Sequence, residues 1–153
     1  MDIVDSIVRS RMMAGIRSKN TKPEMVVRKF LHSKGFRYRL HSAKLPGKPD
    51  LALSKYRTVI FVHGCFWHQH EGCARAYRPS TRKEIWELKF ASNKARDKKV
   101  LDALKELGWN SIVIWECGLV NSDPDIALKW LPYEIEHPKS YLFEWPDTPP
   151  YQT

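Results

Sequence analysis

The stretch from Val62 to Cys73 reads Val-His-Gly-Cys-Phe-Trp-His-Gln-His-Glu-Gly-Cys. It holds three of the chain's six histidines and two of its three cysteines. Thiolates and imidazoles are the preferred ligands of zinc-like metals, and an imidazole can also move a proton near neutral pH. The stretch therefore predicts a metal site with chemistry placed beside it.

The cysteines have the spacing of a closed metal site. Cys65, His70 and Cys73 follow a Cys-x4-His-x2-Cys pattern, and Cys117 supplies a fourth soft ligand from a distant segment. Three thiolates and one imidazole make a tetrahedral zinc site that is structural, because no position is left for water. His68 could replace His70, and the alternative to a metal site is buried free thiols with surface histidines.

Apolar runs on both sides of this stretch predict strands. Residues 58–62 and 111–115 are apolar after their first residues, Thr58 and Ser111, which is typical of strands covered on both faces. Residues 50–53 predict a shorter strand. Apolar and basic residues alternate over 36–41, which predicts a half-exposed strand with a cationic face.

Two longer helices are expected. Thr21 as N-cap and Glu24 form a capping box, and Gly35 stands where the first helix ends. Thr81 and Glu84 start a second helix that runs to Leu107, with a weak point at residues 92–93. Its buried stripe is expected to contain Val100, Leu101, Leu104 and Leu107.

The order of elements predicts one α/β domain over residues 1–153, with a small mixed sheet flanked by helices. Residues 1–20 read as a basic arm that contacts DNA. Asp123-Pro124 can start one short helix, and residues 132–153 have no periodicity and are expected to be irregular.

The charge distribution predicts an anionic partner. The net charge is +9, and twelve lysines and arginines face only four acidic residues before residue 51. A basic arm without a clean apolar helix face favours nucleic acid over a membrane, the alternative being a merely soluble cationic surface. No apolar run approaches the roughly 20 residues of a membrane span. We expect a cytoplasmic protein without disulfides.

A second metal is predicted near Asp50. This residue opens one strand, and His63 ends the next, so that adjacent strand ends can place both on one side of a sheet, with His68 following. A carboxylate, a main-chain carbonyl and substrate phosphate oxygens suit magnesium, and an imidazole can take a proton from the attacking water. Without the histidines, Asp50 after Pro49 would read as a turn residue. Glu24 is either only a helix cap or a water-mediated contact to this site.

Aromatic residues in and after the metal stretch fit DNA. Phe66 and Trp67 on a rigid loop can stack on bases or wedge between them. Trp86, Lys89 and Asn93 share one helix face that offers a ring, a cation and an amide.

For some of these residues a plain structural role competes. Trp86 can instead be an ordinary core residue, and its spacing alone slightly favours the core over insertion into DNA. Met13 and Ile16 can probe a groove or simply cover the sheet.

Together these motifs resemble the very short patch repair (Vsr) DNA mismatch endonucleases, over nearly the whole chain to about Cys117. The matching segments are Arg9-Ser10 with Met13 and Ile16, residues 21–24, 45–50 and 63–68, Thr81-Arg82 with Trp86, and residues 107–109 and 113–117.

The resemblance implies a restriction-endonuclease-like fold and a magnesium-dependent nick 5′ to the thymine of a T:G mismatch. Such mismatches arise when 5-methylcytosine deaminates, so family members accompany cytosine-5 DNA methyltransferases. By resemblance, Asp50 and the Val62 carbonyl bind magnesium, and His68 is the general base. His63 contacts the scissile phosphate or metal-bound water, with Glu24 assisting.

The resemblance also assigns the remaining residues. Zinc is held by Cys65, His70, Cys73 and Cys117. Phe66, Trp67 and Trp86 insert beside the mismatch, Met13 enters from the opposite groove, and Lys89 and Asn93 face the mismatched pair.

Three departures qualify the resemblance. Val62 stands where a threonine can precede the histidine, which is harmless if only its carbonyl ligates. Gln69 interrupts a possible histidine run and so favours His70 as the zinc ligand. The tail after Asn121 matches nothing useful.

Two other functions compete: a restriction-type or nicking endonuclease of the same fold without mismatch preference, and a zinc-stabilised DNA-binding module. A small basic monomer suits an enzyme that nicks one strand.

Overall fold

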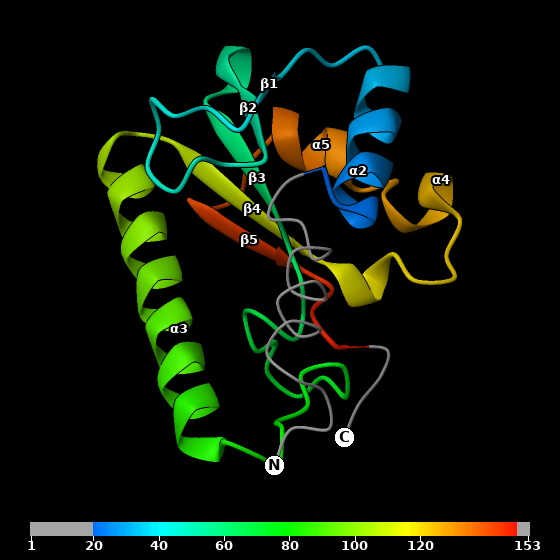
Figure 1. The fold of residues 1–153 in the computed structure, drawn as a ribbon. Coiled ribbons are helices and arrows are strands. Elements are labelled where there is room, and N and C mark those ends of the chain that lie inside the picture. Colours follow the sequence, from blue (N-terminus) through cyan, green and yellow to red (C-terminus); the bar gives the residue numbers. More distant parts are fainter. Residues whose placement is uncertain (1–19, 150–153) are drawn as a thin grey trace.

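One mixed sheet of five strands lies at the centre of the computed structural model, which describes residues 20–149 (Figure 1). Its spatial order is the chain order, β1-β2-β3-β4-β5. The first three strands pair antiparallel, whereas β3, β4 and β5 pair parallel. The strands are Arg39–Leu40 (β1), Leu51–Leu53 (β2), Thr58–His63 (β3), Asn110–Trp115 (β4) and Leu142–Trp145 (β5).

Helices cover both faces of the sheet. Helix α3 (Lys83–Glu106) lies on one face, and α2 (Lys22–Ser33), α4 (Pro124–Ala127) and α5 (Leu131–Glu136) lie on the other (Figure 1). The central strands β3 and β4 are almost entirely buried, as their apolar runs predicted. The predicted α/β class with a mixed sheet flanked by helices is therefore confirmed.

Two hydrophobic cores follow from the alternation of side chains along the strands. The core beneath α2 and α5 includes Leu31, Leu51, Ile60, Ile114 and Leu131. The core beneath α3 includes Val59, Phe61, Leu104, Val113 and Trp115, together with the three cysteines. Residues of β3 alternate between the two cores because successive side chains of a strand point to opposite faces.

Helix α2 begins and ends as predicted, with one difference at its cap. The Glu24 amide donates to Thr21 Oγ1 over 3.3 Å, and Gly35 ends the helix at a φ of +86°. The Glu24 carboxylate, however, accepts from the Asn20 amide over 3.0 Å rather than from Thr21. The second half of the capping box is thus displaced by one residue.

Helix α3 differs from its prediction at both ends. It starts at Lys83 after Arg82, which has a φ of +51° and no side-chain cap, so Thr81 is not its N-cap. It is continuous through residues 92–93. Leu107 is 52% exposed because the helical geometry stops at Glu106, which takes Leu107 out of the buried stripe.

Residues 36–41 form less strand than predicted. Only Arg39 and Leu40 pair with β2, and both are exposed at the sheet edge. Phe36 is buried, and the Tyr38 hydroxyl donates to the Arg28 carbonyl over 3.0 Å. These side chains attach the segment to α2 instead of extending the ladder.

The prediction of an irregular segment after residue 132 was wrong. Helix α5 and strand β5 form there, and β5 pairs with β4 through Ser111↔Leu142 to Ile114↔Trp145. Both elements are too short to show a period in sequence, and β5 is defined by pairing with a distant strand. The short helix after Asp123 is confirmed, since the Asp123 carboxylate accepts from the Asp125 amide over 3.0 Å.

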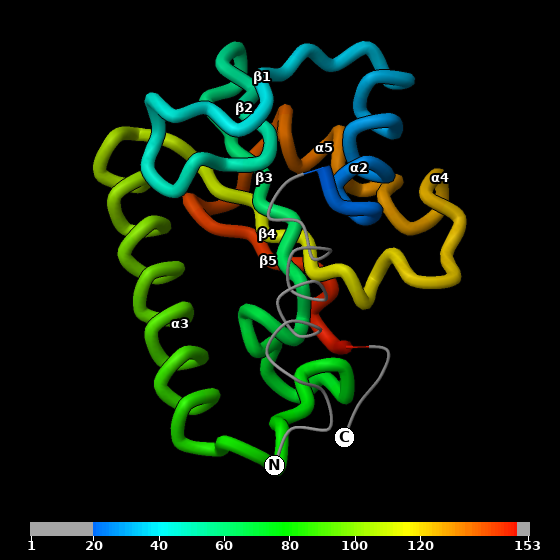
Figure 2. The backbone as a smooth tube through the Cα atoms, in the orientation of Figure 1, coloured from blue at the N-terminus to red at the C-terminus, as the bar shows by residue number. Residues whose placement is uncertain are grey.

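The carboxyl ends of β3 and β4 meet at one edge, because the strands are parallel and His63 pairs with Trp115. The loop between β3 and α3 leaves this edge, opposite to the turn that joins β2 to β3 (Figure 2). The 3-10 helix Glu116–Gly118 leaves the same edge from β4. Parallel strands therefore bring the 62–73 stretch and Cys117 together.

Within residues 20–149, each helix is too short or too polar to cross a bilayer. Met13 and nearly all of the basic arm fall outside the described residues, so their predicted contacts are not addressed by the structure.

Gly118 offers a test of how the tail is packed. A Cβ there would lie 2.5 Å from the Trp145 indole and 3.1 Å from Pro146, both rigid groups. We expect Gly118→Ala to lower the free energy of unfolding by about 1–3 kcal/mol through overpacking, measured by chemical denaturation. Gly64→Ala is the control, since its methyl would meet neighbours only at 3.7 Å or more. Equal stability of both variants would mean that β5 is not packed against this 3-10 helix.

Candidate active site and metal centre

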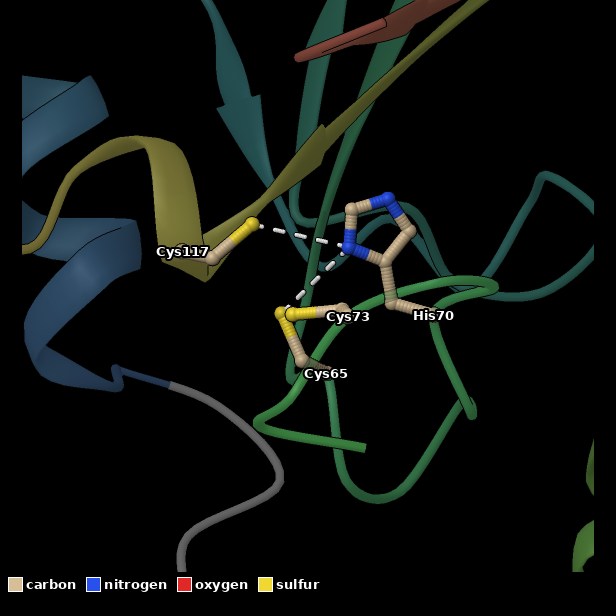
Figure 3. A group of neighbouring side chains, drawn as sticks. All are labelled: Cys65, His70, Cys73 and Cys117. Atoms are coloured by element: carbon tan, nitrogen blue, oxygen red, sulfur yellow. Dashed lines mark hydrogen bonds between the residues drawn. The ribbon is translucent and has the colours of Figure 1, made fainter. Parts of the chain in front are cut away.

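Four buried side chains converge at the carboxyl edge of β3 and β4. The ligand atoms of Cys65, His70, Cys73 and Cys117 all lie within 4.8 Å of one another. Figure 3 shows His70 Nδ1 directed at the cysteine sulfurs. This atom lies 3.7 Å from Cys65 Sγ and 3.5 Å from Cys117 Sγ.

These distances fit a tetrahedral metal. Bond lengths of about 2.3 Å to sulfur and 2.0 Å to nitrogen place sulfur and nitrogen ligands about 3.5 Å apart. The cluster can thus hold a metal ion such as zinc, and with four ligands it is closed. The structure selects His70 for this group, because His68 belongs to a different one.

Main-chain hydrogen bonds shape the loop around the cluster. The His70 amide donates to the Cys65 carbonyl over 3.0 Å, and the Cys73 amide donates to the His70 carbonyl over 3.3 Å. The Glu116 carboxylate accepts from the Cys65 amide over 3.1 Å. Gln69 is buried and donates to the Phe66 carbonyl, so it braces the loop and is not a ligand.

Burial sets the protonation of the cluster without metal. It raises the pKa of the Cys65 thiol, and it raises the pKa of Cys117 to about 11. Burial also lowers the pKa of His70, which keeps its imidazole neutral. Metal binding must therefore expel protons from the thiols, while the imidazole needs to lose none.

A second group contains two carboxylates and one imidazole. Glu24, His41 and Asp50 offer ligand atoms within 4.8 Å of one another. Glu24 is 1% exposed, and its Oε2 lies 3.0 Å from His41 Nε2 and 3.4 Å from Arg28 Nη1. Asp50 Oδ2 accepts from the Val62 amide over 2.7 Å, which ties the start of β2 to the end of β3.

Asp50 is poised between its charged and neutral forms. Burial raises its pKa to about 7, the Val62 amide opposes that rise, and the Glu24 carboxylate adds to it. Two close buried carboxylates repel each other, and a divalent cation between them relieves that repulsion. The donor set therefore fits a hard divalent cation.

The third group lies beneath α3. His63 and His68 stack with ring centroids 3.8 Å apart and an interplanar angle of 3°. His68 Nδ1 lies 2.7 Å from Asp97 Oδ2. The carboxylate needs a donor at that distance, so Nδ1 carries the proton and the lone pair of His68 is on Nε2.

This geometry suits proton transfer better than metal binding. Two parallel stacked rings cannot both direct in-plane lone pairs at one ion. Burial, with His68 and His70 nearby, lowers the pKa of His63 well below its usual value, so His63 stays neutral. A neutral His63 leaves His68 free to accept a proton without a second positive charge against its ring.

A cavity of about 510 Å³ adjoins the stacked histidines. Its lining includes His63, His68, Asp97 and Lys94, and Glu144 from the tail. His63 Nδ1 has no hydrogen-bond partner among the described residues, although it is buried. Burial raises the pKa of Glu144. The tail segment is thus part of the cavity wall beside the stacked histidines.

Aromatic side chains gather where the metal loop meets α3. Phe66 contacts Trp67, Tyr77, Trp86 and Phe90, with centroid distances of 4.8 to 5.4 Å. Of these, Phe90 is buried, whereas Phe66, Trp67 and Trp86 are half-exposed. Trp86 is therefore not ordinary core.

The predicted helix face of Trp86, Lys89 and Asn93 does form, and it meets Trp67. The Trp67 and Trp86 centroids lie 6.0 Å apart, and Lys89 Nζ is 5.0 Å from the Trp67 ring. Asn93 Nδ2 donates to the Trp67 carbonyl over 3.0 Å. Asn93 thus fixes the backbone of the aromatic loop.

Sequence reasoning placed Asp50, His63 and His68 in one centre, and the structure divides them. Asp50 joins Glu24 and His41, whereas the two histidines join Asp97. His63 contacts Phe61 and Trp115 beneath α3, while Val62 packs toward α2. Adjacent strand residues face opposite ways, which explains the division.

The sequence reasoning did not identify His41 and Asp97 as members of these groups. His41 sits in a segment read only as a cationic strand, and Asp97 lies amid a strongly charged helix. The only available sequence signal for Asp97 is its place four residues after Asn93, on the face that meets the loop.

The chain is similar to several known proteins. The family model "DNA mismatch endonuclease Vsr" matches residues 1–75. The "Type II nicking enzyme V.NmeAIP" of Neisseria meningitidis is 47% identical over 120 residues, covering 78% of this chain and 85% of that protein.

The "DNA mismatch endonuclease Vsr" of Escherichia coli K12 is 41% identical over 118 residues, covering 77% of this chain and 75% of that protein. The chain belongs to the Vsr family.

A further relative extends the match. The "Type II nicking enzyme V.XorIIP" of Xanthomonas oryzae is 48% identical over 111 residues, covering 72% of this chain and 81% of that protein. As a Vsr-family member the chain is a DNA endonuclease, a hydrolase of phosphodiester bonds.

Variants of His70, Cys117 and His68 test which side chains are ligands of the metal cluster. We expect His70→Ala and Cys117→Ala to lose bound zinc and to unfold at a lower temperature, because a buried ligand group is left incomplete. Elemental analysis and thermal denaturation measure both effects. His68→Ala should keep its zinc. Zinc lost from His68→Ala but kept by His70→Ala would contradict the ligand assignment.

The raised pKa of Asp50 predicts that the stability of the folded protein depends on pH. Because its folded pKa of about 7 exceeds the ordinary 3.8, the folded state binds the extra proton and wild-type stability falls as pH rises from about 4 to 7. We expect Asp50→Asn, without added magnesium, to unfold at a higher temperature than wild type at pH 8 and at a similar temperature at pH 4.

The control for this experiment is Asp125→Asn, which alters an exposed carboxylate. Magnesium should then stabilise the wild type at pH 8 and leave Asp50→Asn unchanged. A difference between wild type and Asp50→Asn that does not vary with pH would refute the assignment.

Proposed function

We propose that this enzyme nicks one strand of duplex DNA 5′ to the thymine of a T:G mismatch, with magnesium as catalytic ion. The observation that carries the proposal is the Glu24–Asp50 carboxylate pair, tied through Val62 to the strand end that bears the His63–His68–Asp97 group. The cation site and the histidine group flank the carboxyl end of β3 from the two faces of the sheet, and hydrolysis of a phosphodiester needs both a cation and a proton acceptor.

Magnesium is held, in this proposal, by Asp50 and the Val62 carbonyl, with Glu24 assisting. When bound, it offsets the negative charge that develops on the phosphate. The Val62 amide fixes the Asp50 carboxylate through its 2.7 Å hydrogen bond. Because this hydrogen bond fixes the Asp50 carboxylate, it also fixes where the cation, and the phosphate that contacts it, would lie.

His68 acts as the general base. Asp97 holds the proton on Nδ1 and orients the ring, so that Nε2 can take a proton from the attacking water. Asp97 also stabilises the imidazolium that then forms, and so acts as a positioning residue. Neutral His63, stacked on His68, is placed to contact the scissile phosphate.

The aromatic cluster serves DNA recognition. Phe66, Trp67 and Trp86 enter the duplex beside the mismatch, where unstacking costs less than in matched DNA. Lys89, above two of these rings, is placed to meet the backbone or the mismatched pair. Met13 is proposed to enter from the opposite groove.

Other assignments follow the same proposal. The fold is restriction-endonuclease-like, the thiolate cluster holds structural zinc, and the enzyme acts as a monomer in a single domain. It accompanies a cytosine-5 DNA methyltransferase, whose product deaminates to give the mismatch.

A second candidate is a nicking endonuclease of the same fold without mismatch preference. The names of two similar relatives, both called "Type II nicking enzyme", favour keeping this candidate. A DNA-binding module without activity is disfavoured, because binding alone needs neither the His68–Asp97 pair nor the buried carboxylates.

Paired duplexes separate these candidates. With magnesium, we expect the enzyme to nick a T:G duplex on the thymine strand and to leave the matched duplex intact, as measured by denaturing gel electrophoresis. Equal nicking of both duplexes would favour the second candidate. Binding without nicking of either would favour the module.

Variants of His68 and Asp97 test the mechanism on the T:G duplex. We expect His68→Ala to slow nicking by about 10²–10⁴-fold while DNA binding persists. Asp97→Asn should slow it less and shift the pH–rate profile, since the base keeps its position but loses its charged partner. Full activity of His68→Ala would rule out its role as the base.

A further inference from the structure

His41 is held against the carboxylate pair by its backbone as well as its side chain. Its amide donates to the Asp50 carbonyl over 3.2 Å, next to the pairing of β1 with β2. Its Nε2 atom lies 3.0 Å from Glu24 Oε2 and 4.0 Å from Asp50 Oδ1. One residue thus contacts both members of the pair.

The backbone of His41 adopts an uncommon conformation to do this. Its φ is +47°, in the left-handed region that non-glycine residues rarely occupy. Such a conformation costs free energy and persists only where the surroundings hold it. Here it lets the amide bond to Asp50 while the ring reaches Glu24.

The spacing of these atoms matches an octahedral ion. With metal–ligand bonds of about 2.1 Å, adjacent ligands lie about 3.0 Å apart and opposite ligands about 4.2 Å apart. The two distances from His41 Nε2 are 3.0 and 4.0 Å. One ion can therefore be reached by all three side chains.

We propose that His41 Nε2 is a direct ligand of the catalytic cation, beside Glu24 and Asp50, and that it gives the site a preference for Mn²⁺ over Mg²⁺. This inference rests on the metal site of the proposed function. Mg²⁺ takes oxygen ligands almost exclusively, whereas Mn²⁺, although it also suits oxygen ligands, is a transition ion that accepts an imidazole nitrogen more readily than Mg²⁺ does. A nitrogen ligand therefore raises affinity for Mn²⁺ more than for Mg²⁺.

The competing role for His41 is a hydrogen bond that only orients Glu24. Both roles predict weaker metal binding when His41 is removed, so affinity alone does not separate them. Direct ligation has a spectroscopic signature, because a nitrogen bound to Mn²⁺ modulates the electron spin echo of the ion.

The experiment uses the full-length, zinc-loaded protein with one equivalent of Mn²⁺ at pH 8, without DNA. His41→Asn is the test variant, since asparagine tolerates a positive φ and lacks the imidazole. His68→Ala is the matched control, because it removes an imidazole from the neighbouring group. Binding of Mn²⁺ and Mg²⁺ is measured in parallel by calorimetry.

We expect nitrogen modulation in the wild type and in His68→Ala, and its loss in His41→Asn. The ratio of Mn²⁺ to Mg²⁺ affinity should fall about tenfold in His41→Asn. Modulation that is absent from the wild type, or that persists in His41→Asn, overturns the inference.

Asp50→Asn separates this failure from failure of the proposed metal site. If Asp50→Asn abolishes Mn²⁺ binding while His41→Asn leaves the modulation intact, the metal site stands and His41 is not its ligand. If Asp50→Asn binds Mn²⁺ as the wild type does, the proposed metal site itself is wrong.

Discussion

The parallel pairing of β3 with β4 is the constraint on which the rest of the molecule depends. It sets His63 opposite Trp115, so that both strands end at the same edge. The residues that follow them, Cys65 and Cys117, are then brought together from opposite halves of the chain. In an antiparallel pair these two ends would point in opposite directions, and the thiolate cluster could not form.

The cluster then fixes the loop that carries the reactive groups. A polar loop with two glycines has little apolar surface to bury, so four ligands on one ion would be a strong substitute for a core. The loop also presents His68 to Asp97 and Trp67 to Asn93, both on α3. One helix thus holds His68 and the aromatic residue Trp67 in a fixed relation.

Alternation along β3 divides the chemistry between the two faces of the sheet. Val62 contributes its amide to Asp50, which lies with Glu24 of α2, while His63 turns toward α3. The carboxylate pair and the histidine pair are therefore adjacent in sequence but separately supported. Because the two groups are separate, burial raises the pKa of Asp50 beside Glu24, whereas burial lowers the pKa of His63 on the other face of the sheet.

The sequence by itself determined the central strands, the first helix, the thiolate ligands and the family, because each is written in local pattern or ordered motif. The apolar runs 58–62 and 111–115 needed no partner to be recognised, and the cysteine spacing needed no fold. Only the tertiary structure decided that His41 joins Glu24 and Asp50, that Asp97 joins the two stacked histidines, and that the tail forms β5. These depend on contacts between segments far apart in the chain, whose geometry is set by strand pairing and helix packing, and no local pattern encodes that geometry.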